Sequence, residues 1–194
     1  MPKQLIVISA PSGAGKTTVA RHLLQRFPQL RFSVSATTRP KRPGEVDGRD
    51  YFFWSREQFE QAIARGELVE YEEIFGQLYG TLRSQVEQAL STGEFLLFDI
   101  DVKGALALRH AYPEQTFLIY VAPPSIEELE RRLRQRGTES EEQIQRRLER
   151  AAMELQFQDH FDVVIQNEQL EQTLARAEQI VAQLLRGEVP TPVP

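Results

Sequence analysis

The chain contains no cysteine among its 194 residues, which excludes disulfide bonds, thiolate nucleophiles and zinc sites built from sulfur. Long hydrophobic runs are also missing: the apolar stretch 5–8 is far shorter than a signal-peptide core or the roughly 20 residues that span a bilayer. Basic residues are not in excess, because 23 Lys and Arg stand against 28 Asp and Glu. Binding a polymeric nucleic acid requires a surplus of cations, so such a polymer is not the expected partner. We expect a cytoplasmic protein with no membrane partner.

What is present fits one folded domain, since domains average roughly 150 residues and the 41% hydrophobic and 26% charged content is ordinary for globular proteins. The charge is uneven. Residues 1–50 carry 9 basic and 3 acidic side chains, whereas residues 51–100 carry 3 and 9. Because residues 1–50 are basic, this part of the chain is a candidate for binding small anions even though the whole chain is acidic. The composition favours neither a monomer nor a homo-oligomer, and the proline-rich end, 188–194, is predicted to be a flexible tail.

Unbroken apolar runs of strand length recur along the chain, at 5–9, 95–100, 117–121 and 163–166. Such runs are typical of strands that are covered on both faces. Apolar residues are spaced as on one face of a helix in the segment directly after Lys16, at 102–111 and at 170–185. Because parallel neighbours need crossover connections, this alternation predicts an α/β fold with a mostly parallel sheet flanked by helices.

Two segments depart from this alternation. Residues 33–82 combine prolines, glycines and aromatic residues with one short helical pattern at 56–65, and they are predicted to form an inserted α+β lobe. Residues 126–149 are predicted to form two charged helices, each with a thin apolar stripe that packs lightly. The core then comprises 1–32, 83–125 and 150–187.

The sharpest motif is a glycine-rich loop between the first strand and the first helix, Ala10-Pro11-Ser12-Gly13-Ala14-Gly15-Lys16-Thr17, followed by Thr18. In this context the backbone N–H groups curl around phosphates, Lys16 reaches the β- and γ-phosphates, and Thr17 offers a hydroxyl to Mg²⁺. Ala10 stands where the first glycine of the motif is usual. The alternative is a simple glycine-rich turn. The motif in its context predicts a P-loop NTPase-type sheet that binds a nucleoside triphosphate.

The phosphoryl acceptor has to be sought elsewhere in the chain. The Asn-Lys-x-Asp run that marks a GTPase is absent from the sequence. Arg39 and Arg42, separated by a proline, can present two forked guanidinium groups to one phosphate, with Tyr51 as a neutral donor. Taken alone, this segment is more typical of a solvated basic loop.

Together these segments resemble the guanylate kinases, the nucleoside-monophosphate kinases that transfer a phosphoryl group from ATP to GMP. The resemblance extends from about residue 4 to about residue 185, and the matching stretches keep the family's order: 9–17, 32–39, 44–51, 79–81, 99–101, 122–125, 136–139 and 162–167. It implies that 33–82 is a GMP-binding lobe and that 126–149 is a mobile helical lid. It also implies ATP as co-substrate with Mg²⁺, and GMP, with dGMP beside it, as acceptor.

The resemblance assigns residues to the two halves of GMP. Four positions match the family's clamp on the GMP phosphate, namely Arg39, Arg42, Tyr51 and Tyr79. Three match its guanine contacts, namely Ser35, Glu70 and Thr81. The chemistry supports a carboxylate here, because guanine presents N1–H and N2–H donors side by side and adenine does not. Strand alternation places Glu70 and Glu72 on one face and Glu73 on the other, so spacing alone leaves these acids undistinguished, and the resemblance selects Glu70.

Asp99 and Asp101 follow a buried strand, at the carboxyl end where open α/β sheets bind ligands. We assign them jointly to the GMP site and its Mg²⁺. An alternative role for Asp101 is to cap the helix that starts at residue 102. Lys103 stands where a glutamine is commoner in the family, which puts in doubt any role of that amide.

The remaining positions concern the phosphoryl transfer. Arg132, Arg136 and Arg147 match the family's lid arginines, which neutralise the charge of the transferring phosphoryl group. An i,i+4 lattice with neighbouring glutamates is the structural alternative. Asn167 matches a contact to adenine. The predicted catalytic residues are Lys16, Arg39, Arg132, Arg136 and Arg147.

Two other functions are compatible with parts of this sequence. A guanylate-kinase-like scaffold module would share the fold, but such modules typically lack a working phosphate loop, and Lys16 and Thr17 are intact here. A kinase with another small acceptor is opposed by Glu70 and by the pair of Arg39 and Arg42.

Overall fold

The structure, a computed structural model, describes residues 2–11, 13–137 and 140–190. Its central sheet is wholly parallel, and its strands lie in the order β2 (Leu30–Phe32), β7 (Phe95–Asp99), β1 (Leu5–Ser9), β8 (Thr116–Ala122) and β9 (Val163–Gln166). The predicted α/β class with a parallel sheet is confirmed. β1 and β9 have the predicted bounds, β7 ends one residue earlier than predicted, and β8 is one residue longer than predicted at each end. β2 was not predicted, because its three residues are too few to show a pattern.

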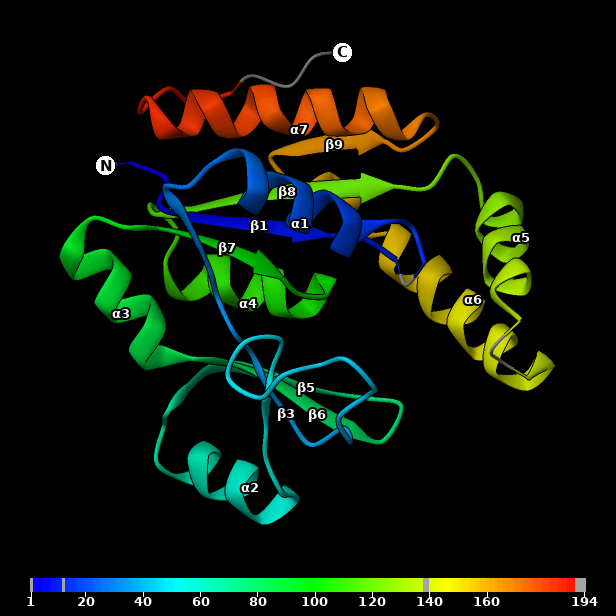
Figure 1. Ribbon diagram of the computed structural model, residues 1–194, viewed down its shortest axis with the longest axis horizontal. Coiled ribbons are helices and arrows are strands. Elements are labelled where there is room, and N and C mark those ends of the chain that lie inside the picture. Colours follow the sequence, from blue (N-terminus) through cyan, green and yellow to red (C-terminus); the bar gives the residue numbers. More distant parts are fainter. Residues whose placement is uncertain (1, 12, 138–139, 191–194) are drawn as a thin grey trace.

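Helices cover both faces of this sheet (Figure 1). On one face α1 (Lys16–Arg26) and α7 (Leu170–Leu185) pack over Ile6 and Ile8 of β1. On the other face α3 (Arg83–Thr92) and α4 (Val102–Ala111) pack over Leu5 and Val7. Successive strand side chains thus enter two different apolar clusters, which is why the run 5–9 is unbroken rather than alternating.

A second, mixed sheet lies beside the carboxyl end of β7, in the order β4 (Phe52–Phe53), β3 (Ala36–Thr37), β6 (Gln77–Leu82) and β5 (Leu68–Ile74). With α2 (Arg56–Ala64) it forms a lobe below the central sheet in Figure 1. Ser55 and Gln58 begin α2 with a capping box, and Phe59 is fully buried in the lobe's own core. All these elements fall inside the segment 33–82.

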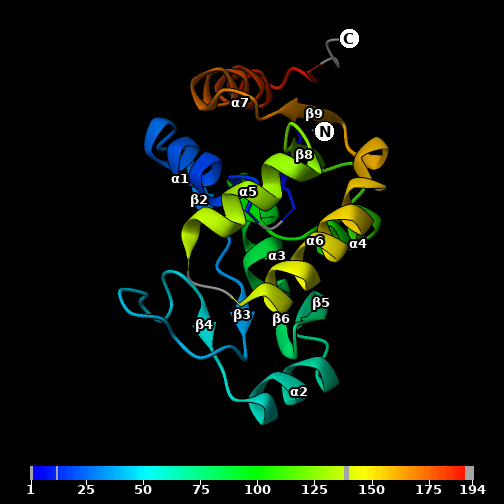
Figure 2. The same cartoon turned by 90° about the vertical axis from the view of Figure 1, so that its right-hand side faces the viewer.

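Two further helices, α5 (Ile126–Arg136) and α6 (Glu141–Leu155), form an arm at the right-hand edge of Figure 1, the side that faces the viewer in Figure 2. Ser125 and Ser140 cap their first turns. Their thin apolar stripes, which include Leu129 and Leu133, join the core cluster beneath α1 and α7. α6 continues past residue 149, the expected end of the lid, to Leu155, and the residues Ala151 and Glu154 of its last turns are buried.

A short 3-10 turn, Gln158–His160, connects α6 to β9, and α7 follows β9. In the expected tail, Glu188 and Val189 are exposed and Pro190 is buried, while 191–194 lie outside the described residues. Among the described residues, no helix is both long and apolar enough to cross a bilayer.

Candidate active site

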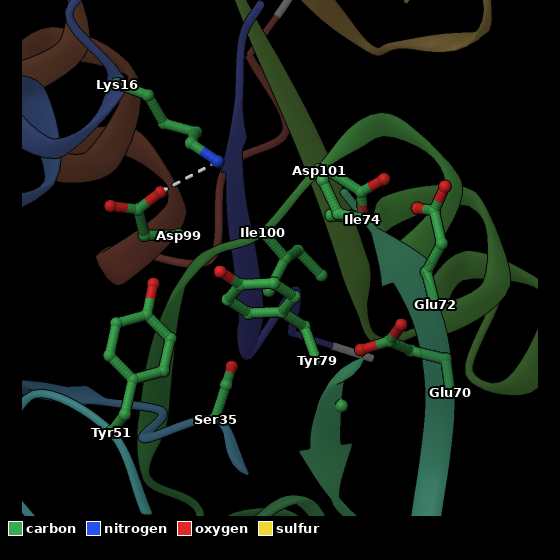
Figure 3. Close-up of a pocket in the computed structure, with 11 residues that line it drawn as sticks. Lys16, Ser35, Tyr51, Glu70, Glu72, Ile74, Tyr79, Asp99, Ile100 and Asp101 are labelled. Carbon is green, nitrogen blue, oxygen red and sulfur yellow. Dashed lines mark ion pairs between the residues drawn. The ribbon is translucent and has the colours of Figure 1, made fainter. Parts of the chain in front are cut away.

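A pocket opens where the carboxyl end of β7 faces the sheet of the lobe (Figure 3). This is the edge at which open parallel sheets bind ligands. Most of its polar lining consists of carboxylates, hydroxyls and one ammonium group. The lining residues are Lys16, Ser35, Tyr51, Glu70, Glu72, Ile74, Tyr79, Gly80, Asp99, Ile100 and Asp101. Seven of the residues predicted to bind nucleotide are therefore brought together here.

The phosphate loop connects β1 to α1, as predicted. Gly13 and Gly15 have φ values of 92° and 98°, a left-handed backbone that favours glycine. Lys16 Nζ lies 3.1 Å from Asp99 Oδ1, and the Thr17 hydroxyl donates to Asp99 Oδ2 at 2.9 Å. Burial disfavours the Lys16 ammonium, but attraction to Asp99 outweighs it and raises the pKa of Lys16. Ala10 and Pro11 are buried and Thr18 is exposed, whereas Ser12 lies outside the described residues.

The side chain of Asn167 packs against the phosphate loop and bonds to it. Its buried side-chain amide donates to the carbonyl oxygen of Ala14 at 2.7 Å, and its own carbonyl oxygen accepts from the Thr173 hydroxyl at 2.9 Å. A Cβ added to Gly15 would lie 2.8 Å from the same amide nitrogen, so the loop and Asn167 are packed closely. Both polar atoms of the side chain are engaged inside the protein, and a contact with adenine stays a prediction.

Glu70 and Thr81 lie opposite each other on β5 and β6. The Thr81 hydroxyl donates to Glu70 Oε1 at 2.5 Å, and burial raises the pKa of Glu70 to about 7. Ser35 is buried in the same wall of the pocket. Glu70 and Glu72 line the pocket while Glu73 is exposed on the other face, which confirms the predicted alternation.

Of the four residues predicted to hold the acceptor phosphate, the structure brings Arg39, Tyr51 and Tyr79 together, whereas Arg42 lies at the surface. Tyr51 and Tyr79 line the pocket, with ring centroids 6.0 Å apart. The Arg39 guanidinium stacks over Tyr51 at 5.3 Å and makes a bidentate pair with Glu45, at 2.7 and 3.0 Å. Arg42 is exposed, and neither arginine is part of the pocket lining. A ligand phosphate would have to compete with Glu45 for Arg39.

The predicted lid arginines lie on the arm rather than in the pocket. Arg132 Nε is 2.9 Å from Glu128 Oε1, and its Nη2 donates to the carbonyl oxygen of Asn167 at 3.3 Å. At Arg132 the i,i+4 pair with Glu128 that the structural alternative predicts is therefore present. Arg147 is half-buried on α6. The side chain of Arg136 and the neighbouring residues 138–139 lie outside the described part of the chain.

The chain matches the family model for guanylate kinase over residues 2–184. It belongs to the guanylate kinase family. It is 52% identical over 168 residues to a guanylate kinase of Chlorobium luteolum, covering 87% of this chain and 85% of that protein. To that of Thermotoga maritima it is 48% identical over 188 residues, covering 97% and 88%. The crystal structure of guanylate kinase from Anaplasma phagocytophilum superposes with a TM-score of 0.76 at 35% identity, over 93% of this chain and 85% of that one.

Family membership confirms the resemblance found in the sequence, but two side chains at the site were not among the predicted residues. Glu72 lines the pocket beside Glu70. Arg150 of α6 lies 2.9 Å from Asp101, which also caps α4 through a 3.0 Å bond from the Gly104 N–H. The cap was expected as an alternative role of Asp101. The only sequence signal for Arg150 is its i,i+4 spacing to Glu154, which says nothing of contacts with other elements.

Proposed function

We propose that the chain transfers the γ-phosphoryl group of ATP to GMP, and to dGMP, giving ADP and GDP, in the synthesis and recycling of guanine nucleotides. The observation that carries the proposal is that Lys16 of the phosphate loop and the buried carboxylate of Glu70 line one pocket, from opposite sides (Figure 3). With the triphosphate of ATP on the loop and the guanine of GMP against Glu70, the γ-phosphate and the GMP phosphate would lie next to each other between Lys16 and Glu70. Membership of the guanylate kinase family supports the same reaction.

On the ATP side, the loop at 10–17, its N–H groups and the amino end of α1 would hold the β- and γ-phosphates. Lys16 would exchange Asp99 for phosphate oxygens. The bond from the γ-phosphorus to the bridging oxygen breaks, and a bond to a phosphate oxygen of GMP forms. The protein's part is to position the two nucleotides and to compensate charge, so no general base is needed.

The site also suits Mg²⁺. The Thr17 hydroxyl and the Asp99 carboxylate are hard oxygen donors 2.9 Å apart. Among the described residues, no group of three or more His, Asp or Glu side chains could hold a metal alone. This fits an ion that keeps water and phosphate oxygens as ligands and enters with ATP. When bound, Mg²⁺ would neutralise charge on the β- and γ-phosphates.

On the GMP side, Glu70 would accept from guanine N1–H and N2–H, with Ser35 and Thr81 beside it. Tyr51 and Tyr79 would donate to the GMP phosphate, and Arg39 and Arg42 would reach it once Arg39 releases Glu45. Asp101 would complete the wall of the pocket. Closure of the lid, residues 126–149 of the arm, would bring Arg132, Arg136 and Arg147 onto the transferring phosphoryl group and exclude water. The proposed setting is the cytoplasm, in line with the absence of cysteine.

A coupled assay of ADP release with GMP, dGMP, AMP, CMP, UMP and dTMP tests the proposal. We expect activity with the guanine nucleotides that exceeds activity with the others by about a hundredfold or more, because a buried carboxylate leaves the wrong base unpaired. Turnover of AMP or of a pyrimidine nucleotide at the rate of GMP would refute the assignment.

Lys16→Ala tests the ATP side of the site. We expect turnover to fall by about a hundredfold or more, because the only ammonium in the pocket lining is lost at the transferring phosphate. Lys3→Ala is the matched control, since this half-buried lysine precedes β1, donates to the Pro113 carbonyl oxygen and is not part of the pocket lining. Equal activity of the two variants would contradict the role of Lys16.

A further inference from the structure

A cluster centred on Arg150 connects three parts of the molecule. The Arg150 Nη2 atom of α6 lies 2.9 Å from Asp101 Oδ2, at the start of α4, and 3.2 Å from Glu72 Oε1, on β5 of the lobe. Its Nε atom lies 2.7 Å from Glu154 Oε1 on its own helix. One guanidinium group is therefore bonded to the arm, the core and the lobe at once.

The cluster is almost closed to solvent. The side chains of Arg150, Asp101 and Glu72 are 15%, 15% and 13% exposed, and that of Glu154 is 4% exposed. Three carboxylates thus share one buried cation. Two other cations act on these acids. Lys103 Nζ lies 3.3 Å from the same Glu72 oxygen but is 57% exposed and so compensates less, and Lys16 attracts Asp101 and Glu154 but is itself paired with Asp99. Buried charges left without a partner are costly, so the orientation of these acids depends on Arg150.

Two acids of this cluster contact Arg150 and also line the pocket. Asp101 and Glu72 line the pocket with Glu70, whereas Arg150 is not in the lining (Figure 3). The second oxygen of Glu72, Oε2, is buried and has no hydrogen-bond partner within the described part of the chain. Arg150 and Lys103 both bind Oε1, so neither of these cations holds Oε2.

We propose that Arg150 is a positioning residue for the acceptor nucleotide, acting through Asp101 and Glu72, which it orients toward the pocket and whose charge it compensates. The inference rests on the proposed function, since GMP is the acceptor it concerns. A GMP phosphate is itself anionic and enters a pocket lined by four carboxylates, Glu70, Glu72, Asp99 and Asp101. Loss of Arg150 leaves two of them without their main cation, and the added repulsion acts on GMP and not on ATP at the loop.

The test compares Arg150→Gln with wild type in KM for GMP, KM for ATP and kcat, and in the dissociation constant of GMP measured by calorimetry without ATP. We expect KM and the dissociation constant for GMP to rise about tenfold or more, with kcat at saturating GMP and KM for ATP changed less than about threefold, as for a lost ground-state interaction. Arg150→Lys keeps the charge but not the fork and should recover part of the affinity. Arg146→Gln is the matched control, because Arg146 lies on the same helix, is 63% exposed and pairs with Glu142 at the surface, away from the cluster.

Glu72→Gln separates the charge of Glu72 from its shape and keeps the proposal testable if Arg150→Gln folds poorly. Alone it should change KM for GMP by less than about threefold, because Arg150 still binds Asp101. In the double variant with Arg150→Gln it should restore about threefold or more of the lost GMP affinity, because one uncompensated charge is gone.

Three results would overturn the proposal. They are a KM for GMP within about twofold of wild type in Arg150→Gln, an equal rise in KM for ATP, and no recovery of GMP affinity in the double variant. The wild-type assay tests the proposed function separately. If the wild type does not phosphorylate GMP, the proposed function is refuted. If the wild type is active and Arg150→Gln has an unchanged KM for GMP, only this inference is refuted.

Discussion

At the scale of single residues, Gly104 shows how closely the pocket is packed. A Cβ at this position would lie 2.9 Å from both Asp101 Oδ1 and Glu70 Oε2. We expect Gly104→Ala to displace these two carboxylates and to raise KM for GMP about tenfold, with KM for ATP unchanged. Alanine is favoured over glycine in a helix by about 1 kcal/mol, which offsets the cost of disturbing the Asp101 cap on the Gly104 N–H, so the thermal midpoint should change little. A large fall in the midpoint with unchanged KM would contradict this account.

Glu70 decides base choice if the proposed function holds. In Glu70→Gln one of the two acceptor oxygens becomes a donor and faces guanine donors, so kcat/KM for GMP should fall by about a hundredfold and the preference for GMP over AMP should narrow. Glu73→Gln is the matched control, because Glu73 lies on the same strand and is exposed on its opposite face. The same substrate panel measures both variants, and an unchanged preference in Glu70→Gln would refute its role.

At the scale of elements, the hairpin between β5 and β6 contains a strained residue. Ile74 pairs with Gln77, so the loop is Phe75-Gly76, and φ is positive at both positions, 49° and 78°. Two-residue loops of this kind favour Asn-Gly, and a bulky residue there is unfavourable by about 1 kcal/mol. Phe75 is 54% exposed, so little packing is lost on its removal.

We therefore expect Phe75→Asn to raise the free energy of unfolding by about 0.5–1 kcal/mol in urea titrations without changing activity. Tyr71→Asn is the control. Tyr71 is 52% exposed on the neighbouring strand but has an extended backbone, so asparagine there should lower stability. A gain in both variants would show that removal of an exposed aromatic residue, and not relief of the turn, is the cause.

The elements also show what the sequence could and could not predict. β1 and α7 were predicted with their observed bounds, because one is a continuous apolar run and the other a long stripe of period 3.6. β3 and β4 have two residues each, too few for any periodicity, and α3 begins without a side-chain cap at Leu82. In the site, Glu72 was placed on the correct face by alternation. Arg150 could not be placed, because its partners Asp101 and Glu72 lie 49 and 78 residues away in sequence.

At the scale of the whole molecule, the burial of acidic side chains in the pocket lowers the stability of the fold at neutral pH. The ordinary pKa of Glu70 is 4.5, and burial raises it to about 7, while burial also raises the pKa of Glu72. Between these two values the folded chain keeps a proton on Glu70 that the unfolded chain has released. The folded state is thus favoured by the neutral acid below pH 4.5, and this contribution is lost as the pH rises through 7. Guanine needs the charged form, so GMP affinity should change in the opposite direction.

The difference in unfolding free energy between Glu70→Gln and wild type isolates this effect, because the other titrating groups are common to both chains. Glutamine imitates the neutral acid, so the difference should be small near about pH 5 and should grow to on the order of 1–3 kcal/mol in favour of the variant above about pH 8. Over the same range the wild-type affinity for GMP should fall as the pH drops below about 7, whereas KM for ATP should not follow it. Chemical denaturation at several pH values and calorimetric GMP titrations measure the two trends. A stability difference that stays flat with pH would show that Glu70 is charged throughout, and the opposition between binding and folding would then have no basis in this residue.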